Sequence, residues 1–146
     1  MIQNNFAQEY ETYKVCEAEY DSAADEAGKE AARQKVRGLL DSMADKPEGY
    51  NRMFNMYKDA KERGNEYIDV SECIWDRDVE PMVSRFRSFG ITHFTFSSTW
   101  SSAVETAWLF TQNGCTLEGI VEINSQYSNF GGEGYEKAHG YLFKVN

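Results

Sequence analysis

The chain has 146 residues and a mass of 16.8 kDa, which is the size of one ordinary domain. It is 41% hydrophobic and 14% aromatic and holds two prolines, so it can bury a core and is not wholly disordered. Its 24 acidic residues exceed its 15 basic ones, and the formal charge is −9. Because nucleic acids and anionic membranes are polyanions, this charge opposes nonspecific binding to either of them.

The N-terminal residues have neither the basic stretch nor the apolar run of a signal peptide, and no apolar run approaches the ~20 residues that span a bilayer. Cys16, Cys73 and Cys115 are widely spaced and form no C-x-x-C pair, which argues against zinc and redox motifs. The sequence therefore predicts a cytoplasmic protein with reduced thiols that contacts no membrane and needs no metal or cofactor.

The first 64 residues have the apolar periodicity of two or three packed helices. Gly28 and the small residues around it are expected to break or bend the helical run, Pro47 to begin a third helix, and Gly64 to cap that helix. The apolar stripes are Phe6, Tyr10, Tyr13 and Tyr20, then Ala32, Val36, Leu39, Leu40 and Met43, and then Tyr50, Met53, Phe54 and Tyr57.

After residue 64 the pattern changes to alternating strands and helices. A short strand over 66–70 is followed by a helix that ends at Gly90, with Asp76 or Asp78 as its N-cap. The β-branched and aromatic run 91–96 predicts the next strand.

A second helix then opens on the Ser102-x-x-Glu105 capping box and ends at Gly114. Its apolar side is expected to consist of Val104, Ala107, Trp108 and Thr111, with Trp108 buried. Alternation at Leu117, Val121 and Ile123, and again at Tyr141, Phe143 and Val145, predicts two more strands, which pair as a hairpin across the loop 125–139.

These elements predict an α+β or α/β fold. A helical region, residues 1–64, precedes an α/β sheet region, residues 65–146, in which two helices pack on a small four-stranded sheet. Because no Pro- or Ser-rich linker separates the regions, we expect one compact unit.

Catalytic motifs are weak in this chain. The Ser/Thr run 97–102 lies at a strand-to-helix junction, where many sites lie, but it lacks the G-x-S-x-G elbow and the glycine spacing of a P-loop. His93 and His139 are the only histidines, and their spacing does not suggest a metal site. The glycine loop 131–134 is interpreted as a turn. We therefore predict no catalytic residue and no metal ligand.

Negative charge gathers in two segments. Residues 1–26 hold seven acidic residues and one basic residue, and residues 59–80 hold eight acidic and three basic ones. Trp75 and Trp100 lie beside predicted element ends, where we expect exposed side chains that favour a protein interface. The predicted partner-binding residues are Glu9, Glu11, Glu17, Glu19, Asp21, Asp69, Glu72, Asp76, Asp78, Trp75 and Trp100.

The segment from about residue 64 to residue 146 resembles small, uncharacterised acidic proteins carried by mobile elements and phages of gut Gram-positive bacteria. The resemblance covers a little over half of the chain. The stretches that carry it are 64–69, 74–76, 90–103, 106–110 and 115–119. No activity is assigned to these proteins, so the resemblance implies no catalytic residue. It implies an anti-CRISPR protein, with a Cas9-type effector as the favoured target, because mobile elements must survive host defence nucleases.

Charge and resemblance together predict a noncatalytic inhibitor that binds the basic surface of a host nuclease, with its carboxylates in place of nucleic-acid phosphates. The basic stretch 29–37 departs from a pure polyanion mimic and is expected to face the acidic N-terminal helix or to contact RNA or an acidic partner. One alternative is an accessory protein of a conjugative element that acts through protein contacts alone. A further alternative is a small enzyme that uses the 97–102 turn with His93 or His139.

Overall fold

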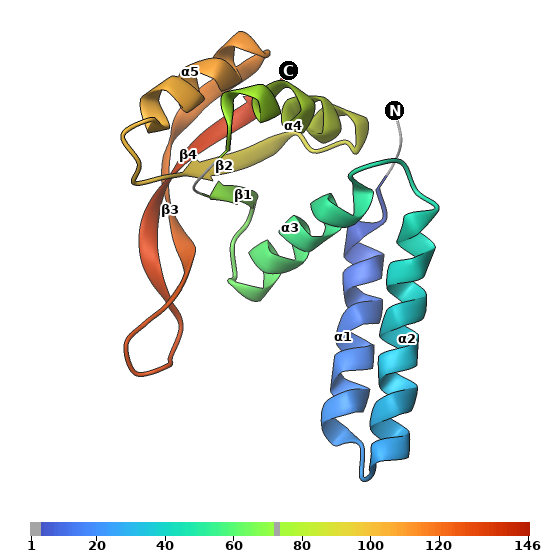
Figure 1. The fold of residues 1–146 in the computed structure, drawn as a ribbon. Helices are drawn as coiled ribbons and strands as arrows, with labels where there is room; N and C mark the ends of the chain where they lie inside the picture. The colour runs from blue at the N-terminus through green and yellow to red at the C-terminus, as the bar shows by residue number, and fades with distance from the viewer. Residues whose placement is uncertain (1–3, 72–73) are drawn as a thin grey trace. The chain divides into compact units, whose positions relative to one another are not determined.

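The computed structural model describes residues 4–71 and 74–146. They form two compact units, Asn4–Asn55 and Met56–Asn146, and the division falls inside the third helix. Figure 1 shows the elements in chain order: α1 (Phe6–Ser22), α2 (Glu26–Ala44), α3 (Tyr50–Glu62), β1 (Ile68–Ser71), α4 (Asp76–Ser88), β2 (His93–Ser97), α5 (Ala103–Gln112), β3 (Cys115–Ser128) and β4 (Tyr135–Val145).

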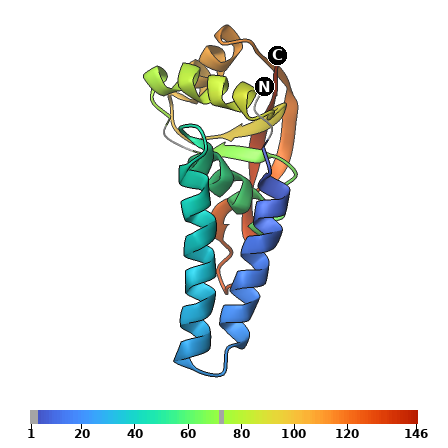
Figure 2. The ribbon, with the colours of Figure 1, turned by 90° about the vertical axis from the view of Figure 1, so that its right-hand side faces the viewer.

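In the first unit, α1 and α2 lie side by side as a helical hairpin (Figure 2). The break between them lies at residues 23–25, where the Asp25 carboxylate accepts a hydrogen bond from the Gly28 backbone N–H at 2.8 Å. Gly28 itself belongs to the first turn of α2, so the predicted break near Gly28 falls on the small residues that precede it. An aspartate N-cap ends the break because it satisfies an N–H that the helix leaves unpaired.

The third helix begins at Tyr50, three residues after Pro47, which therefore does not open it as predicted. Gly49 has a φ of 88°, a value that no right-handed helix contains, so the helix starts only after it. The helix ends as predicted, because Gly64 has a φ of 75° and its N–H donates to the Lys61 carbonyl.

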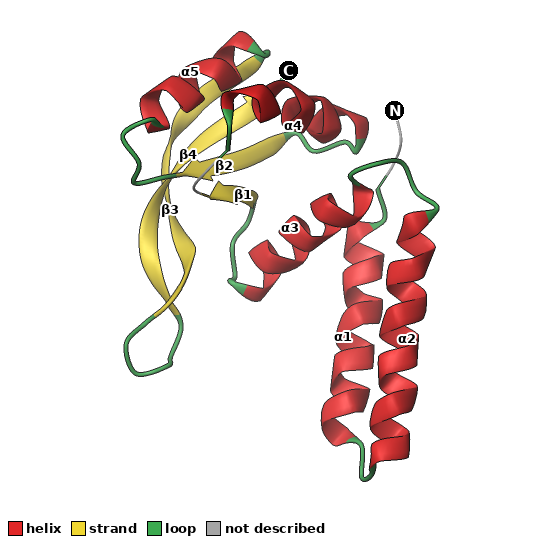
Figure 3. Cartoon of the chain, viewed as in Figure 1, coloured by secondary structure: helices red, strands yellow, loops and turns green. Residues whose placement is uncertain are grey.

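The second unit is built on a mixed sheet with the strand order β1-β2-β4-β3. β1 and β2 are parallel and the other pairs are antiparallel. Helices α4 and α5 pack on the sheet (Figure 3). The core between the helices and the sheet contains Phe86, Phe94, Phe110 and Phe143, and the centroids of neighbouring rings in this cluster lie 4.6 to 5.4 Å apart. The predicted helical region followed by a four-stranded sheet with two packed helices is confirmed, and the fold is α+β.

Both helix starts in this unit differ from the prediction. Trp75, not an aspartate, is the N-cap of α4, and Asp76 and Asp78 lie in its first turn, where their charge favours the helix dipole. At α5 the Ser102 side chain makes no cap hydrogen bond, so the capping box with Glu105 is not formed.

The buried side of α5 is also different from the predicted one. Thr106 and Phe110 are buried, whereas Val104 and Trp108 are 79% and 59% exposed. The helix is apolar on more than one side, and it meets the sheet on one side only. Spacing alone did not distinguish the side that faces the core, and the prediction that Trp108 is buried is wrong.

The β3–β4 hairpin is longer than predicted, and its loop shrinks to residues 129–134. Two register shifts interrupt the ladder, one between Leu117 and Gly119 and one between Asn124 and Ser128. The first one breaks the alternation from which Leu117 was placed on a half-buried strand, and this side chain is 49% exposed.

Candidate functional site

The predicted acidic residues of α1 do not share one face. With 3.6 residues per turn they project at about 0°, 200°, 80°, 280° and 120° around the helix axis. The residues, in the same order, are Glu9, Glu11, Glu17, Glu19 and Asp21. A flat basic surface therefore meets only part of this set at one time.

Three of these carboxylates already have partners in the hairpin unit. Glu9 accepts a hydrogen bond from the Tyr50 hydroxyl, Glu11 pairs with Lys14 at 3.1 Å, and Glu19 pairs with Lys35 at 2.6 Å. Burial, followed by the hydrogen bond to Glu9, raises the pKa of Tyr50 to about 12. Glu9 thus helps to hold Tyr50, the first residue of α3, against α1, which is a structural role.

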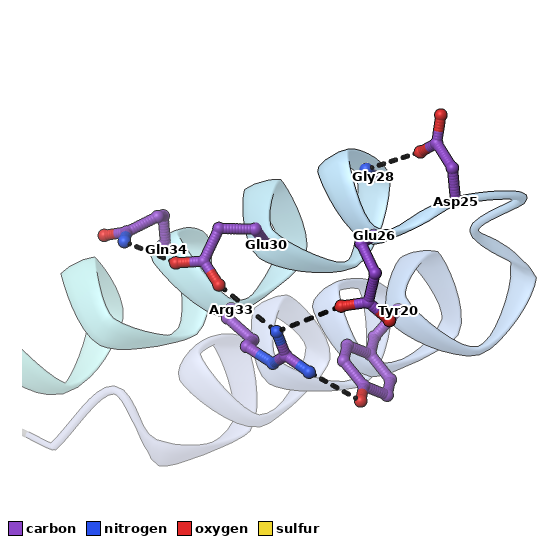
Figure 4. A network of polar contacts seen from close by, with 7 residues as sticks. All are labelled: Tyr20, Asp25, Glu26, Gly28, Glu30, Arg33 and Gln34. Carbon is purple, nitrogen blue, oxygen red and sulfur yellow. Dashed lines mark hydrogen bonds and ion pairs between the residues drawn. The ribbon is translucent and has the colours of Figure 1, made fainter.

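The basic stretch 29–37 is engaged mainly within the hairpin. Arg33 on α2 donates to the Tyr20 hydroxyl at 3.1 Å and to Glu30 at 3.2 Å, and it lies 3.8 Å from Glu26 (Figure 4). The hydrogen bond to Tyr20, and then that to Glu30, raises the pKa of Arg33. With the Lys35–Glu19 pair, these contacts confirm that the basic stretch faces the acidic first helix.

Asp69 lies on β1, whereas Asp76 and Asp78 lie in the first turn of α4. Its carboxylate accepts hydrogen bonds from Thr95 Oγ1 at 2.6 Å and Ser97 Oγ at 2.7 Å, across the parallel β1–β2 pair. Burial raises the pKa of Asp69 despite these bonds. A partly buried carboxyl whose oxygens are both occupied is a poor docking group for a partner. Glu72, also predicted to bind the partner, lies outside the described residues.

Trp75, Asp76 and Trp100 meet in one pocket of about 500 Å³, which we call the tryptophan pocket. It lies where α4 and α5 begin, and Trp75 and Trp100 are 67% and 56% exposed. Asp78 lies in the first turn of α4, and it does not line the pocket. The lining residues are Ile74, Trp75, Asp76, Arg77, Phe96, Ser98, Trp100, Ser102, Glu105 and Thr106.

The tryptophan pocket combines aromatic rings with charged side chains. Asp76 and Glu105 supply two exposed carboxylates, and Arg77 supplies one guanidinium, which lies 5.9 Å from the centroid of the Trp75 ring. The pocket floor includes Phe96 and Thr106, both buried, so it rests on the sheet core. Such a site suits a ligand that has an apolar stem and a positive end.

A second pocket, of about 480 Å³, gathers hydroxyl side chains, and we call it the serine pocket. It brings Ser97, Ser98 and Thr99 together with His139, whereas His93 lies elsewhere and pairs with Glu118 at 3.0 Å. The Ser97 hydroxyl already donates to Asp69. The sequence analysis paired this turn with either His93 or His139, and of the two only His139 lines the pocket with it.

Sequence reasoning also missed Asn65, which is 8% exposed and joins the α3–β1 loop to β3. Its side chain donates to the Asn124 carbonyl and accepts from the Asn124 N–H, both at 2.9 Å. An asparagine after a glycine cap is typical of an ordinary loop, so no local pattern predicted that Asn65 links this loop to β3.

Among the described residues, no group of three or more His, Cys, Asp or Glu side chains is arranged to hold a metal ion. Cys16 and Cys115 are buried free thiols, and Cys73 lies outside the described residues. A search of the helices in residues 4–71 and 74–146 finds none that is long and apolar enough to cross a membrane.

Comparison with known proteins places the chain in a family. Residues 52–145 match the family described as "Domain of unknown function (DUF7698)", and the chain belongs to this family. No curated protein and no solved structure matches the chain. The match begins inside α3 and covers the sheet unit with both candidate pockets, while α1 and α2 lie outside it.

Proposed function

We propose that the protein acts by binding a partner protein with a basic surface, and that Trp75 and Trp100 anchor the contact. The observation that carries the proposal is that two indole side chains, each more than half exposed, line one pocket together with two carboxylates. Large aromatic side chains in a partly desolvated pocket are the usual centres of protein interfaces.

The chemistry of the tryptophan pocket favours an arginine or lysine side chain of the partner. Aromatic faces attract cations, and the exposed rings of Trp75, which already lies beside Arg77 of this chain, and of Trp100 supply such faces. Asp76 and Glu105 would balance the incoming charge. The surrounding net charge of −9 would speed the encounter with a basic partner and would make binding sensitive to salt.

For the partner we propose a host nucleic-acid-processing nuclease in the cytoplasm, with a Cas9-type effector as the first candidate and inhibition as the outcome. Such enzymes hold nucleic acid in basic channels, which an acidic protein can occupy. The choice of a nuclease rests on the sequence resemblance to proteins of mobile elements. The contact itself rests on the pocket.

The test measures cleavage by a panel of Cas9-type effectors and restriction enzymes, with and without the protein, at low salt. We expect stoichiometric inhibition of at least one enzyme. Trp75→Ala with Trp100→Ala should weaken binding by about 30-fold or more, which corresponds to about 2 kcal/mol. Trp108→Ala is the matched control, because Trp108 is 59% exposed and does not line the pocket.

Absence of binding to every enzyme at low salt would reject the nuclease. Equal losses in the control and in the pocket variant would reject the pocket. An accessory protein of a conjugative element remains the alternative, and it predicts a stable complex with another element-encoded protein and no effect on nucleases.

The serine pocket supports a second candidate, an enzyme, because it brings Ser98 and His139 together. Ser98→Ala and His139→Ala would each abolish such an activity without loss of the fold. His139→Ala should leave nuclease inhibition unchanged if the tryptophan pocket is the working site, because His139 does not line that pocket, whereas Ser98 lines both pockets.

A further inference from the structure

The α1–α2 hairpin has an apolar groove along part of its length. The groove has a volume of about 370 Å³ and lies between the two helices. Its lining residues are Tyr13, Cys16, Glu17, Tyr20, Ala32, Arg33, Val36, Arg37 and Leu40. Two helices alone cannot enclose a core, and Leu40 in this groove is 38% exposed. The groove therefore calls for a further apolar surface.

The hairpin also lies outside the family match, which begins at residue 52. The groove is thus an addition to the family domain, and the domain fold does not account for it. Its wall residues are spaced by three and four positions on each helix, the pattern of helices that pack into bundles.

Charge indicates which surface covers the groove. Helix α1 carries five acidic residues and one basic residue, and α2 carries four basic residues and three acidic ones. A second copy of the same hairpin therefore offers the opposite charge to each helix, provided that α1 of one copy faces α2 of the other. We propose that two copies of the chain associate groove to groove through their hairpins and form an antiparallel four-helix bundle.

The register supports this arrangement. Within the hairpin Glu19 pairs with Lys35, and Tyr20 with Arg33, so Glu17 lies at about the level of Arg37. A two-fold axis parallel to the helices keeps every residue at the same height along the bundle in both copies. It therefore places Glu17 of one copy opposite Arg37 of the other. The alternative axis, perpendicular to the helices, would set the acidic α1 against its own copy.

Glu17 and Arg37 are suited to this pairing because neither forms an ion pair within the described residues. Arg33, in contrast, is already held by Tyr20, Glu30 and Glu26 (Figure 4). Arg33 links α2 to α1 within each hairpin, whereas Arg37 remains available for an ion pair with the partner copy.

The interface is of modest size. A helix of 17 residues is about 26 Å long, and a pair of helices is about 20 Å wide, so each copy offers at most roughly 500 Å², since Phe6 at the start of α1 is already covered by Tyr50 and Phe54. A total of at most about 1,000 Å² does not exceed the lower limit of specific interfaces. We therefore expect a dimer that forms with rising concentration.

The experiment measures the molar mass of the full chain by light scattering over a concentration series. We expect a rise from 16.8 kDa toward twice that value. Glu17→Arg and Arg37→Glu should each weaken the dimer by about tenfold or more, and the double variant should return to within about threefold of the parent. Asp41→Arg, an equal charge change outside the groove, should have no effect.

Leu40→Asp should abolish the dimer, with the helical circular dichroism signal retained. A monomer at every concentration would overturn the proposal. A dimer that resists all of these changes would also overturn it, because another surface would then hold the copies together. Failure of the double variant to recover would reject the proposed pairing of α1 with α2.

Discussion

Asn65 provides the sharpest test of how the sheet unit is held together. Its side chain satisfies both backbone groups of Asn124 at 2.9 Å in a place that is 8% exposed. In Asn65→Ala both groups lose their partner, and each unsatisfied buried group costs about 1–3 kcal/mol. Together they could cost about 2–6 kcal/mol, and because Asn124 is only half-buried we expect the free energy of unfolding of this unit to fall by the lower part of this range, about 2–4 kcal/mol.

The assay is urea unfolding followed by tryptophan fluorescence. Trp75, Trp100 and Trp108 all belong to the Met56–Asn146 unit, so the signal reports this unit alone. With a slope of about 2 kcal/mol per molar urea, the midpoint should fall by about 1–2 M. Asn65→Asp keeps the acceptor and loses the donor, and we expect a smaller loss.

The control is Asn129→Ala, which removes an amide that donates to the Glu133 carbonyl at 2.9 Å in the exposed hairpin loop. We expect a change within about 0.5 kcal/mol. If Asn65→Ala and Asn129→Ala lower stability equally, the Asn65 bridge does not support the fold and the reasoning fails.

Three further outcomes follow from the sheet unit. Burial raises the pKa of Asp69 in the folded protein above its unfolded value of 3.8. The favourable contribution of Asp69 to the free energy of unfolding is therefore present below pH 3.8 and is lost as pH rises through the folded pKa. In Asp69→Asn, urea titrations at a series of pH values should show a smaller change of stability over this pH range. Gly140→Ala would place a Cβ 3.0 Å from Thr95 Cβ, and thermal melts should show a loss of about 1–3 kcal/mol. Phe110→Ala should lower the free energy of unfolding, measured in urea, by about 3–5 kcal/mol, because Phe110 is fully buried. Trp108→Ala, on the opposite side of α5, should change it by less than about 0.5 kcal/mol. Equal losses in the two variants would contradict the observed helix orientation.

The order and type of the elements could be predicted because each has a local cause. The stripe at Tyr50, Met53, Phe54 and Tyr57 predicts a helix, and Gly64 ends it with a positive φ. These signals depend on residues close in sequence, which is why the fold class was found without the structure.

Orientation and long-range contact could not be predicted in the same way. Spacing placed Trp108 in the core, since α5 has apolar residues on both sides and only the packed sheet selects Phe110. Likewise, Asn65 and Asn124 are 59 residues apart, and no local pattern links them.

The candidate site was predicted in part. Trp75, Asp76 and Trp100 were named from the sequence, and they line one pocket. The acidic residues of α1 were predicted as a group from the composition of the segment. Composition does not say which face of a helix a side chain lies on, and the helix distributes these residues around its axis. Whether any of these residues binds a partner stays a prediction.

The two register shifts in the β3–β4 hairpin have a consequence for solubility. β3 is the outer strand of its sheet, and both shifts insert extra residues into β3 and none into β4. They divide this 14-residue edge strand into short regular segments, so it offers no long uninterrupted series of unpaired backbone N–H and C=O groups with which a strand of another molecule could pair. We therefore expect the irregular hairpin to oppose fibrous self-assembly, even though Ile120 and Tyr127 are exposed along it.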